Sequence, residues 1–163
     1  MNLKNRNKMK LVFILSFAYL MLSCVSYQNG TNGNQSNDFY LEIRQTVSGA
    51  SKQHTFVFTK NELHIFENSI SKNGLTERKE IYSKKIKNSE KVGDIESKTQ
   101  KLASLKSEYI NAQLGGLRWE IDFIKGDTNK KIVVENATVT EIQILFETIN
   151  AIIPDNKPQL HKN

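Results

Sequence analysis

The chain has 163 residues, of which 38% are hydrophobic and 25% charged, and its formal net charge at pH 7 is +6. Four of the 23 basic residues precede residue 11 and all 17 acidic residues follow residue 37, so 19 basic residues stand against 17 acidic ones after residue 23, a net charge of +2. This length suits one domain rather than two, and so small a net charge argues against a nucleic-acid-binding protein.

Residues 1–23 have the organisation of a secretory signal peptide. Four basic residues precede a run of uncharged, mostly apolar residues that extends from Leu11 to Ser23, which is the order that such peptides require. A helix needs about 20 apolar residues to cross the hydrocarbon core of a bilayer, and this run is shorter. We therefore predict a targeting segment that is removed rather than a permanent membrane span.

The end of this run, Met21-Leu22-Ser23-Cys24, resembles the lipobox of bacterial lipoproteins, in which an apolar residue lies three positions before a cysteine and a small residue directly before it. Met21 and Leu22 stand where the family usually has Leu and a small residue. The resemblance covers residues 1–24. It implies that the Cys24 sulfur receives a diacylglyceryl group, that the chain is cut before Cys24, and that the new amino terminus is acylated.

Cys24 is the only cysteine of the chain, so no disulfide can form within it. Three alternatives to lipidation remain open: an uncleaved anchor, ordinary cleavage after Ser26, and a chance cysteine in a cytoplasmic protein. Each buried methylene of an acyl chain contributes about 0.8 kcal/mol to membrane binding, so several chains on one cysteine would make attachment permanent.

Residues 24–37 are uncharged and rich in Asn and Gly. We expect a flexible tether with an r.m.s. reach of roughly 20 Å. Val25 follows the cysteine, whereas in some enteric bacteria Asp at this position marks retention in the inner membrane. The resemblance to lipoproteins therefore favours the outer membrane, with the domain facing the periplasm.

Apolar and polar residues alternate from Asp38, which is typical of a half-buried strand. Phe39, Leu41 and Ile43 share one face of this strand, and Glu42 and Arg44 share the other. Further strands are predicted where β-branched and aromatic residues recur. These strands are 55–59, 62–67 and a polar edge strand at 78–87, the last two joined by a turn over 69–77.

Two helices and a hairpin are predicted in the second half. The spacing of apolar residues indicates a helix over 88–109, capped by Asn88 or Ser89. A coiled coil with a partner is the alternative, for which the pattern is short. Strands 117–124 and 131–135 form a hairpin, with the first expected at the centre of the sheet.

The second helix opens at Thr138, with Glu141 as its capping-box partner, and Pro154 ends it. We expect residues 155–163 to be a loose tail. The fold class is therefore α+β, in which an antiparallel sheet of about five or six strands carries two helices on one face. Residues 38–154 form the single domain.

The residues that carry most chemistry are sparse. His54, His64 and His161 are the only histidines and include no pair spaced to bind a metal on a helix, so no metal and no cofactor are predicted. Glu120 and Asp122 point to one strand face, and a carboxylate pair is the minimum for acid and base catalysis at a sugar bond. Charged residues at alternate positions are also what the solvent-exposed face of a strand ordinarily carries.

Two aromatic residues, Tyr40 and Trp119, lie in predicted strands and offer either a ligand platform or packing. We interpret the chain as an envelope lipoprotein whose domain binds a protein partner, as an inhibitor or immunity protein does. The alternative is a structural accessory of an envelope complex. An enzyme, the third hypothesis, would require a deep pocket that gathers Glu120, Asp122 or a histidine, and we assign no catalytic residue.

Overall fold

The computed structural model describes residues 39–70, 76–112 and 115–161, without the side chain of residue 70. These described residues belong to one compact unit. The predicted signal peptide, the lipobox and the whole tether predicted over 24–37 lie outside the described residues, as does the centre of the turn predicted over 69–77. The lipobox residues concerned are Met21, Leu22, Ser23 and Cys24.

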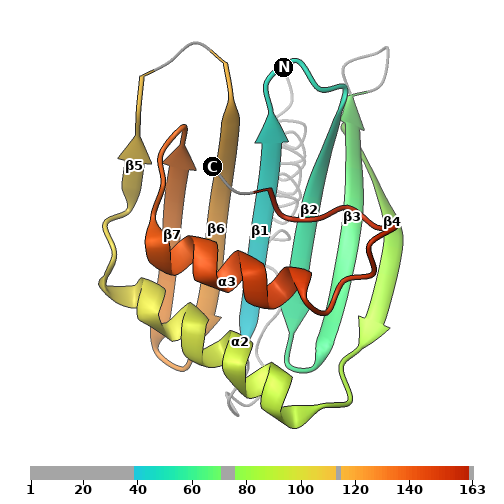
Figure 1. Ribbon diagram of the computed structural model, residues 1–163, viewed down its shortest axis with the longest axis vertical. Helices are drawn as coiled ribbons and strands as arrows, with labels where there is room; N and C mark the ends of the chain where they lie inside the picture. The colour runs from blue at the N-terminus through green and yellow to red at the C-terminus, as the bar shows by residue number, and fades with distance from the viewer. Residues whose placement is uncertain (1–38, 71–75, 113–114, 162–163) are drawn as a thin grey trace, which may run out of the picture. The chain divides into compact units, whose positions relative to one another are not determined.

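A seven-stranded sheet forms the centre of the domain, and two helices cross one of its faces (Figure 1). The spatial order of the strands is β4-β3-β2-β1-β6-β7-β5. In chain order the elements are β1 (Tyr40–Val47), β2 (Lys52–Thr59), β3 (Glu62–Ile70), β4 (Thr76–Lys85), α2 (Ser89–Lys101), a 3-10 turn (Leu102–Ser104), β5 (Glu108–Ile110), β6 (Leu117–Lys125), β7 (Thr128–Glu135) and α3 (Thr140–Asn150).

The α+β class is confirmed, but the predicted number of strands is too small and the sheet is mixed. The additional strand is β5, which pairs with β7 in parallel. Val133 N donates to Ser107 O at 2.8 Å and Asn111 N donates to Glu135 O at 2.9 Å. The helix predicted over 88–109 therefore ends early, because its last residues find backbone partners in a strand that follows them in the chain.

The apolar residues that alternate with polar ones in β1 and β6 form the sheet side of the core. Register pairs Leu41 with Phe123 and Ile43 with Ile121, and all four side chains are fully buried. The strand at 117–124, predicted at the centre of the sheet, is internal and lies between β7 and the central strand, β1. The predicted edge strand, β4, does lie at the sheet edge, where its charged residues discourage pairing with other chains.

The two helices start differently. Asn88 caps α2 as predicted, since its Oδ1 accepts from Glu90 N at 2.9 Å and from Lys91 N at 3.2 Å. The predicted capping box of α3 is wrong: the cap residue is Val139, which makes no side-chain hydrogen bond. Val139 belongs to the core and is 7% exposed, so its burial determines where α3 begins.

Residues 155–161 are not a loose tail. Asn150 Nδ2 donates to Leu160 O at 2.8 Å, and Asn150 Oδ1 accepts from Leu160 N at 2.9 Å. The Leu160 side chain is 2% exposed within the core cluster. The segment crosses the helix side of the sheet beside α3 (Figure 1), and one buried leucine in an otherwise polar stretch was too weak a signal to predict this.

Candidate functional site

The sheet has one face covered by helices and one face that no described helix covers (Figure 1). We call the second the open face. Register places Glu42 opposite Asp122, and Arg44 opposite Glu120, on this face. The open face of the three strands β1, β6 and β7 carries mostly charged side chains, namely Glu42, Arg44, Arg118, Glu120, Asp122, Lys131 and Glu135.

Arg44 lies at the centre of an ion-pair network on this face. Its Nε is 3.5 Å from Glu42 Oε1, its Nη2 is 3.5 Å from Glu120 Oε2, and Nη2 also contacts Asp122. One guanidinium therefore joins three carboxylates on two neighbouring strands. The predicted pair Glu120 and Asp122 is brought together, with a cation between its members.

Glu120 is held by two further cations. Lys131 Nζ lies 3.1 Å from Glu120 Oε2 and Arg118 Nη2 lies 3.2 Å from Glu120 Oε1. The hydrogen bond from Lys131, together with that from Arg118, outweighs partial burial and lowers the pKa of Glu120 below its ordinary value. A general acid on a sugar bond needs a raised pKa, so the surroundings of Glu120 suit ion pairing rather than proton donation.

The two candidate aromatic residues have different surroundings. Trp119 is fully buried, with its ring 5.5 Å from that of Phe146, and its Nε1 donates to Gln45 Oε1 at 3.2 Å. The packing interpretation is therefore correct for Trp119. The Tyr40 hydroxyl donates to Glu42 Oε2 at 2.5 Å, and burial, with the nearby Glu42 carboxylate, raises the pKa of Tyr40.

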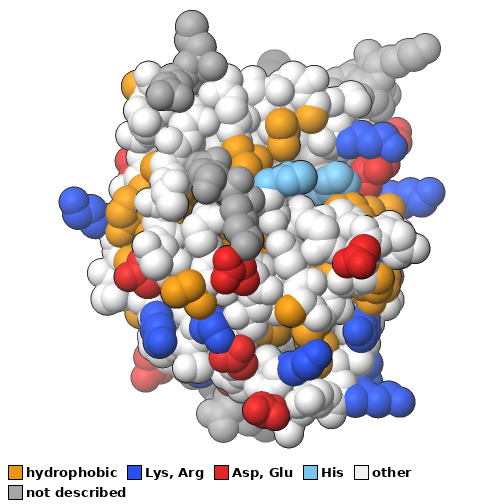
Figure 2. All heavy atoms as spheres, in the orientation of Figure 1, with side chains coloured by type: hydrophobic (Ala, Val, Ile, Leu, Met, Phe, Trp, Pro, Cys, Tyr) orange, Lys and Arg blue, Asp and Glu red, His pale blue; other side chains and the backbone are white. Residues whose placement is uncertain are grey.

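No histidine forms an ion pair with the Arg44 network in the described structure, although His54 and Glu120 both line the hollow beside it. His64 Nδ1 is 2.8 Å from Glu80 Oε2 and its Nε2 is 3.6 Å from Glu62 Oε2. Burial lowers the pKa of His54, and its other charged neighbours are Glu67, His161 and Lys52. Figure 2 shows histidine side chains together on the helix side, among interspersed acidic and basic groups. In the described part of the chain, no group of three or more His, Cys, Asp or Glu is arranged to hold a metal.

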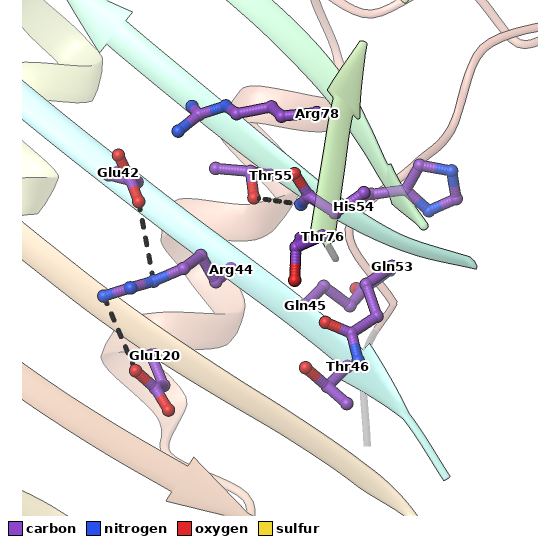
Figure 3. Close-up of a pocket in the computed structure, with 11 residues that line it drawn as sticks. Glu42, Arg44, Gln45, Thr46, Gln53, His54, Thr55, Thr76, Arg78 and Glu120 are labelled. Atoms are coloured by element: carbon purple, nitrogen blue, oxygen red, sulfur yellow. Dashed lines mark hydrogen bonds and ion pairs between the residues drawn. The ribbon is translucent and has the colours of Figure 1, made fainter. Parts of the chain in front are cut away.

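A hollow of about 350 Å³ adjoins the network at the end of the sheet (Figure 3). Arg44 forms one side of it, paired with Glu42 and Glu120, and Arg78 extends along the other side. Arg78 is exposed and its guanidinium carbon lies 4.0 Å from the centre of the Phe66 ring. Arg78 is not singled out by its sequence pattern, because alternation places it on a strand face but does not reveal which side chains of β3 lie beside it.

The comparisons with known proteins do not assign this chain to a family. The sequence matches no known protein family and no curated protein. Within the described residues, no helix has both the length and the apolar character needed to cross a membrane.

Proposed function

We propose that this protein is an envelope lipoprotein, anchored through Cys24, whose domain binds a protein partner through the open face of its sheet, as an inhibitor or immunity protein does. The lipobox resemblance and the single cysteine support the anchor. By the same resemblance, Val25 after the cysteine favours the outer membrane, with the domain facing the periplasm.

The open face is the observation that carries the binding proposal. It combines the Arg44 network with exposed apolar side chains, since Ile110 and Ile124 lie on this face with exposed fractions of 55% and 43%. Protein interfaces combine apolar contact with polar groups whose hydrogen bonds are satisfied. Each charge of the network lies near an opposite charge, so a partner would not have to desolvate an unpaired ion there. Arg44 Nε is the one buried atom of the network that makes no hydrogen bond among the described residues.

The anchor is tested by the intact mass of the native protein beside that of a Cys24→Ala variant. We expect a mass that corresponds to cleavage before Cys24 plus added acyl chains, and its absence in the variant. An unmodified mass would contradict the anchor. The length of the chain would then separate a secreted soluble protein from an uncleaved one.

The binding face is tested by photo-crosslinking in cells that make the full chain. A photoreactive benzoylphenylalanine replaces Ile124 on the open face or, as the matched control, Ile144 on α3, which is also 43% exposed. We expect a covalent adduct with one defined protein from position 124 and none from position 144. Adducts from position 144 alone would contradict the proposal, and an adduct with a component of a membrane assembly would favour the structural-accessory function.

A further inference from the structure

The hollow on the open face has a simple origin in the sheet register. Glu120, Arg44, Thr55 and Phe66 lie side by side in one row across β6, β1, β2 and β3. Thr55 is the shortest of the four, so the row dips between the long Arg44 side chain and the Phe66 ring. Thr55 is 2% exposed and forms the floor of the hollow.

The two arginines of the hollow differ in their partners. Arg44 is surrounded by Glu42, Glu120 and Asp122 and has no charge left to offer a ligand. Arg78 forms no ion pair with any residue that the structure describes, and its guanidinium carbon lies 4.0 Å from the centre of the Phe66 ring, on which it stacks. That stack holds the planar guanidinium in place without using its hydrogen-bond donors.

Neutral side chains that can form hydrogen bonds line the hollow between the two arginines. Asn68 Nδ2 donates to Thr55 Oγ1 at 2.7 Å, and Asn68 lies beside Arg78, its partner in the β3–β4 register. Gln53 lies opposite Asn68 on β2 and also lines the hollow. The site therefore offers one fixed cation and flanking amides.

The polar lining of the hollow favours a protein ligand over a small molecule. Small-molecule sites are mostly apolar and enclose most of the ligand surface, whereas all eleven residues that line this hollow are polar or charged. The hollow is also part of the sheet face that Ile124 and the Arg44 network occupy. A depression that receives one anchoring side chain is common at the centre of protein interfaces.

We infer that Arg78 anchors an acidic side chain of the partner protein. The Asp or Glu carboxylate enters the hollow and accepts two parallel hydrogen bonds from the guanidinium, the geometry that arginine favours. Gln53 and Asn68 hydrogen-bond to the backbone of the same partner residue. This inference rests on the proposed function, because it specifies which chemistry the partner presents to the open face.

The test is a titration of the full chain in detergent micelles with N-acetyl-glutamic acid methylamide, a blocked residue with one carboxylate. The NMR signals are those of the Arg78 Nε–H group and of the Gln53 and Asn68 side-chain amides. We expect saturable shifts with this probe and none with N-acetyl-glutamine methylamide.

Arg78→Gln should weaken binding about tenfold, because a charge-assisted hydrogen bond is lost. Lys79→Gln removes the same charge from the neighbouring residue, which lies on the opposite face, and should leave binding unchanged.

Three results would overturn the inference. Equal weakening by Arg78→Gln and Lys79→Gln would show general attraction between charges rather than a site. Equal binding of the glutamine probe would show that the carboxylate is not recognised. Tighter binding of glucuronate than of the blocked glutamic acid would point to a sugar acid instead of a protein. The titration needs no partner and the crosslinking at position 124 needs no Arg78, so the two proposals fail separately.

Discussion

Gln45 is a polar side chain in the middle of the core, and it joins three parts of the chain. It is 2% exposed, its Oε1 accepts from Trp119 Nε1 at 3.2 Å and from His161 N at 2.7 Å, and its Nε2 donates to Gln159 O at 3.3 Å. A buried amide is tolerated when its donors and acceptors are paired. Here the pairing also attaches the end of the chain to the sheet.

Gln45→Leu should lower the free energy of unfolding by about 2–4 kcal/mol, because Trp119 Nε1 would stay buried without a partner and the backbone groups of Gln159 and His161 would lose theirs. The measurement is urea denaturation followed by circular dichroism. The matched control is Gln143→Leu on α3. Both side-chain amide atoms of Gln143 are buried and make no hydrogen bond in the described structure, so this change should be neutral or stabilising. Equal losses in the two variants would contradict this role of Gln45.

Glu120 should make stability depend on pH in acid. The pKa of Glu120 is lowered in the folded chain, chiefly by Lys131, so its contribution is present above its ordinary value of 4.5 and is lost as the pH falls through the lower, folded value. The difference in unfolding free energy between the native chain and Glu120→Gln should therefore shrink below about pH 4.5. Denaturation curves from pH 7 to pH 3 measure it. A difference that stays constant over this range would contradict the ion-pair role.

At the scale of elements, hydrogen bonds with side chains of β5 and β7 determine where α2 ends. Lys130 on β7 donates through Nζ to Ala103 O at 2.8 Å and also contacts Leu105 O. These carbonyl groups lie just after α2 and would otherwise lack intrahelical partners. The Tyr109 hydroxyl accepts from Lys106 N at 3.0 Å, so Tyr109 belongs to the turn and β5 instead of the helix.

The C-terminal segment should behave as part of the domain. Leu160→Ala removes a buried side chain and should cost about 2–3 kcal/mol of unfolding free energy. His161→Ala is the control, since the His161 side chain is exposed and its backbone N–H still reaches Gln45; its effect should stay within about 0.5 kcal/mol. Thermal and urea denaturation measure both. An effect of Leu160→Ala as small as that of His161→Ala would show that the segment is loose after all.

At the scale of the whole molecule, strands and helices of residues 39–161 share one core cluster, which includes Trp119, Phe146, Ile95 and Leu160. A domain with one core unfolds cooperatively. Trp119 is the only tryptophan and is fully buried, so its fluorescence reports on the core. Fluorescence and far-ultraviolet circular dichroism should give the same denaturation midpoint. Separate midpoints would show that the sheet and its helices unfold independently.

Local pattern alone was sufficient for much of the fold. Alternation in β1 and β6, the Asn88 cap and the apolar face of α3 each depend on residues within a few positions of one another. Such short-range signals can be read from the chain because side-chain periodicity directly reflects helix and strand geometry. The predicted signal peptide and the lipobox at Cys24 are also local patterns, and they stay predictions.

Only the tertiary structure decided the features that depend on distant partners. The parallel pairing of β5 with β7, the attachment of Leu160 through Asn150 and the three carboxylates around Arg44 each join segments that are remote in the chain. The hollow beside Arg78 likewise depends on the register of β1, β2, β3 and β4. Within the strands and α3, sequence by itself determined which residues face the core, because burial there follows local periodicity. Which charged groups meet on the open face follows from strand order and register, which no local pattern contains.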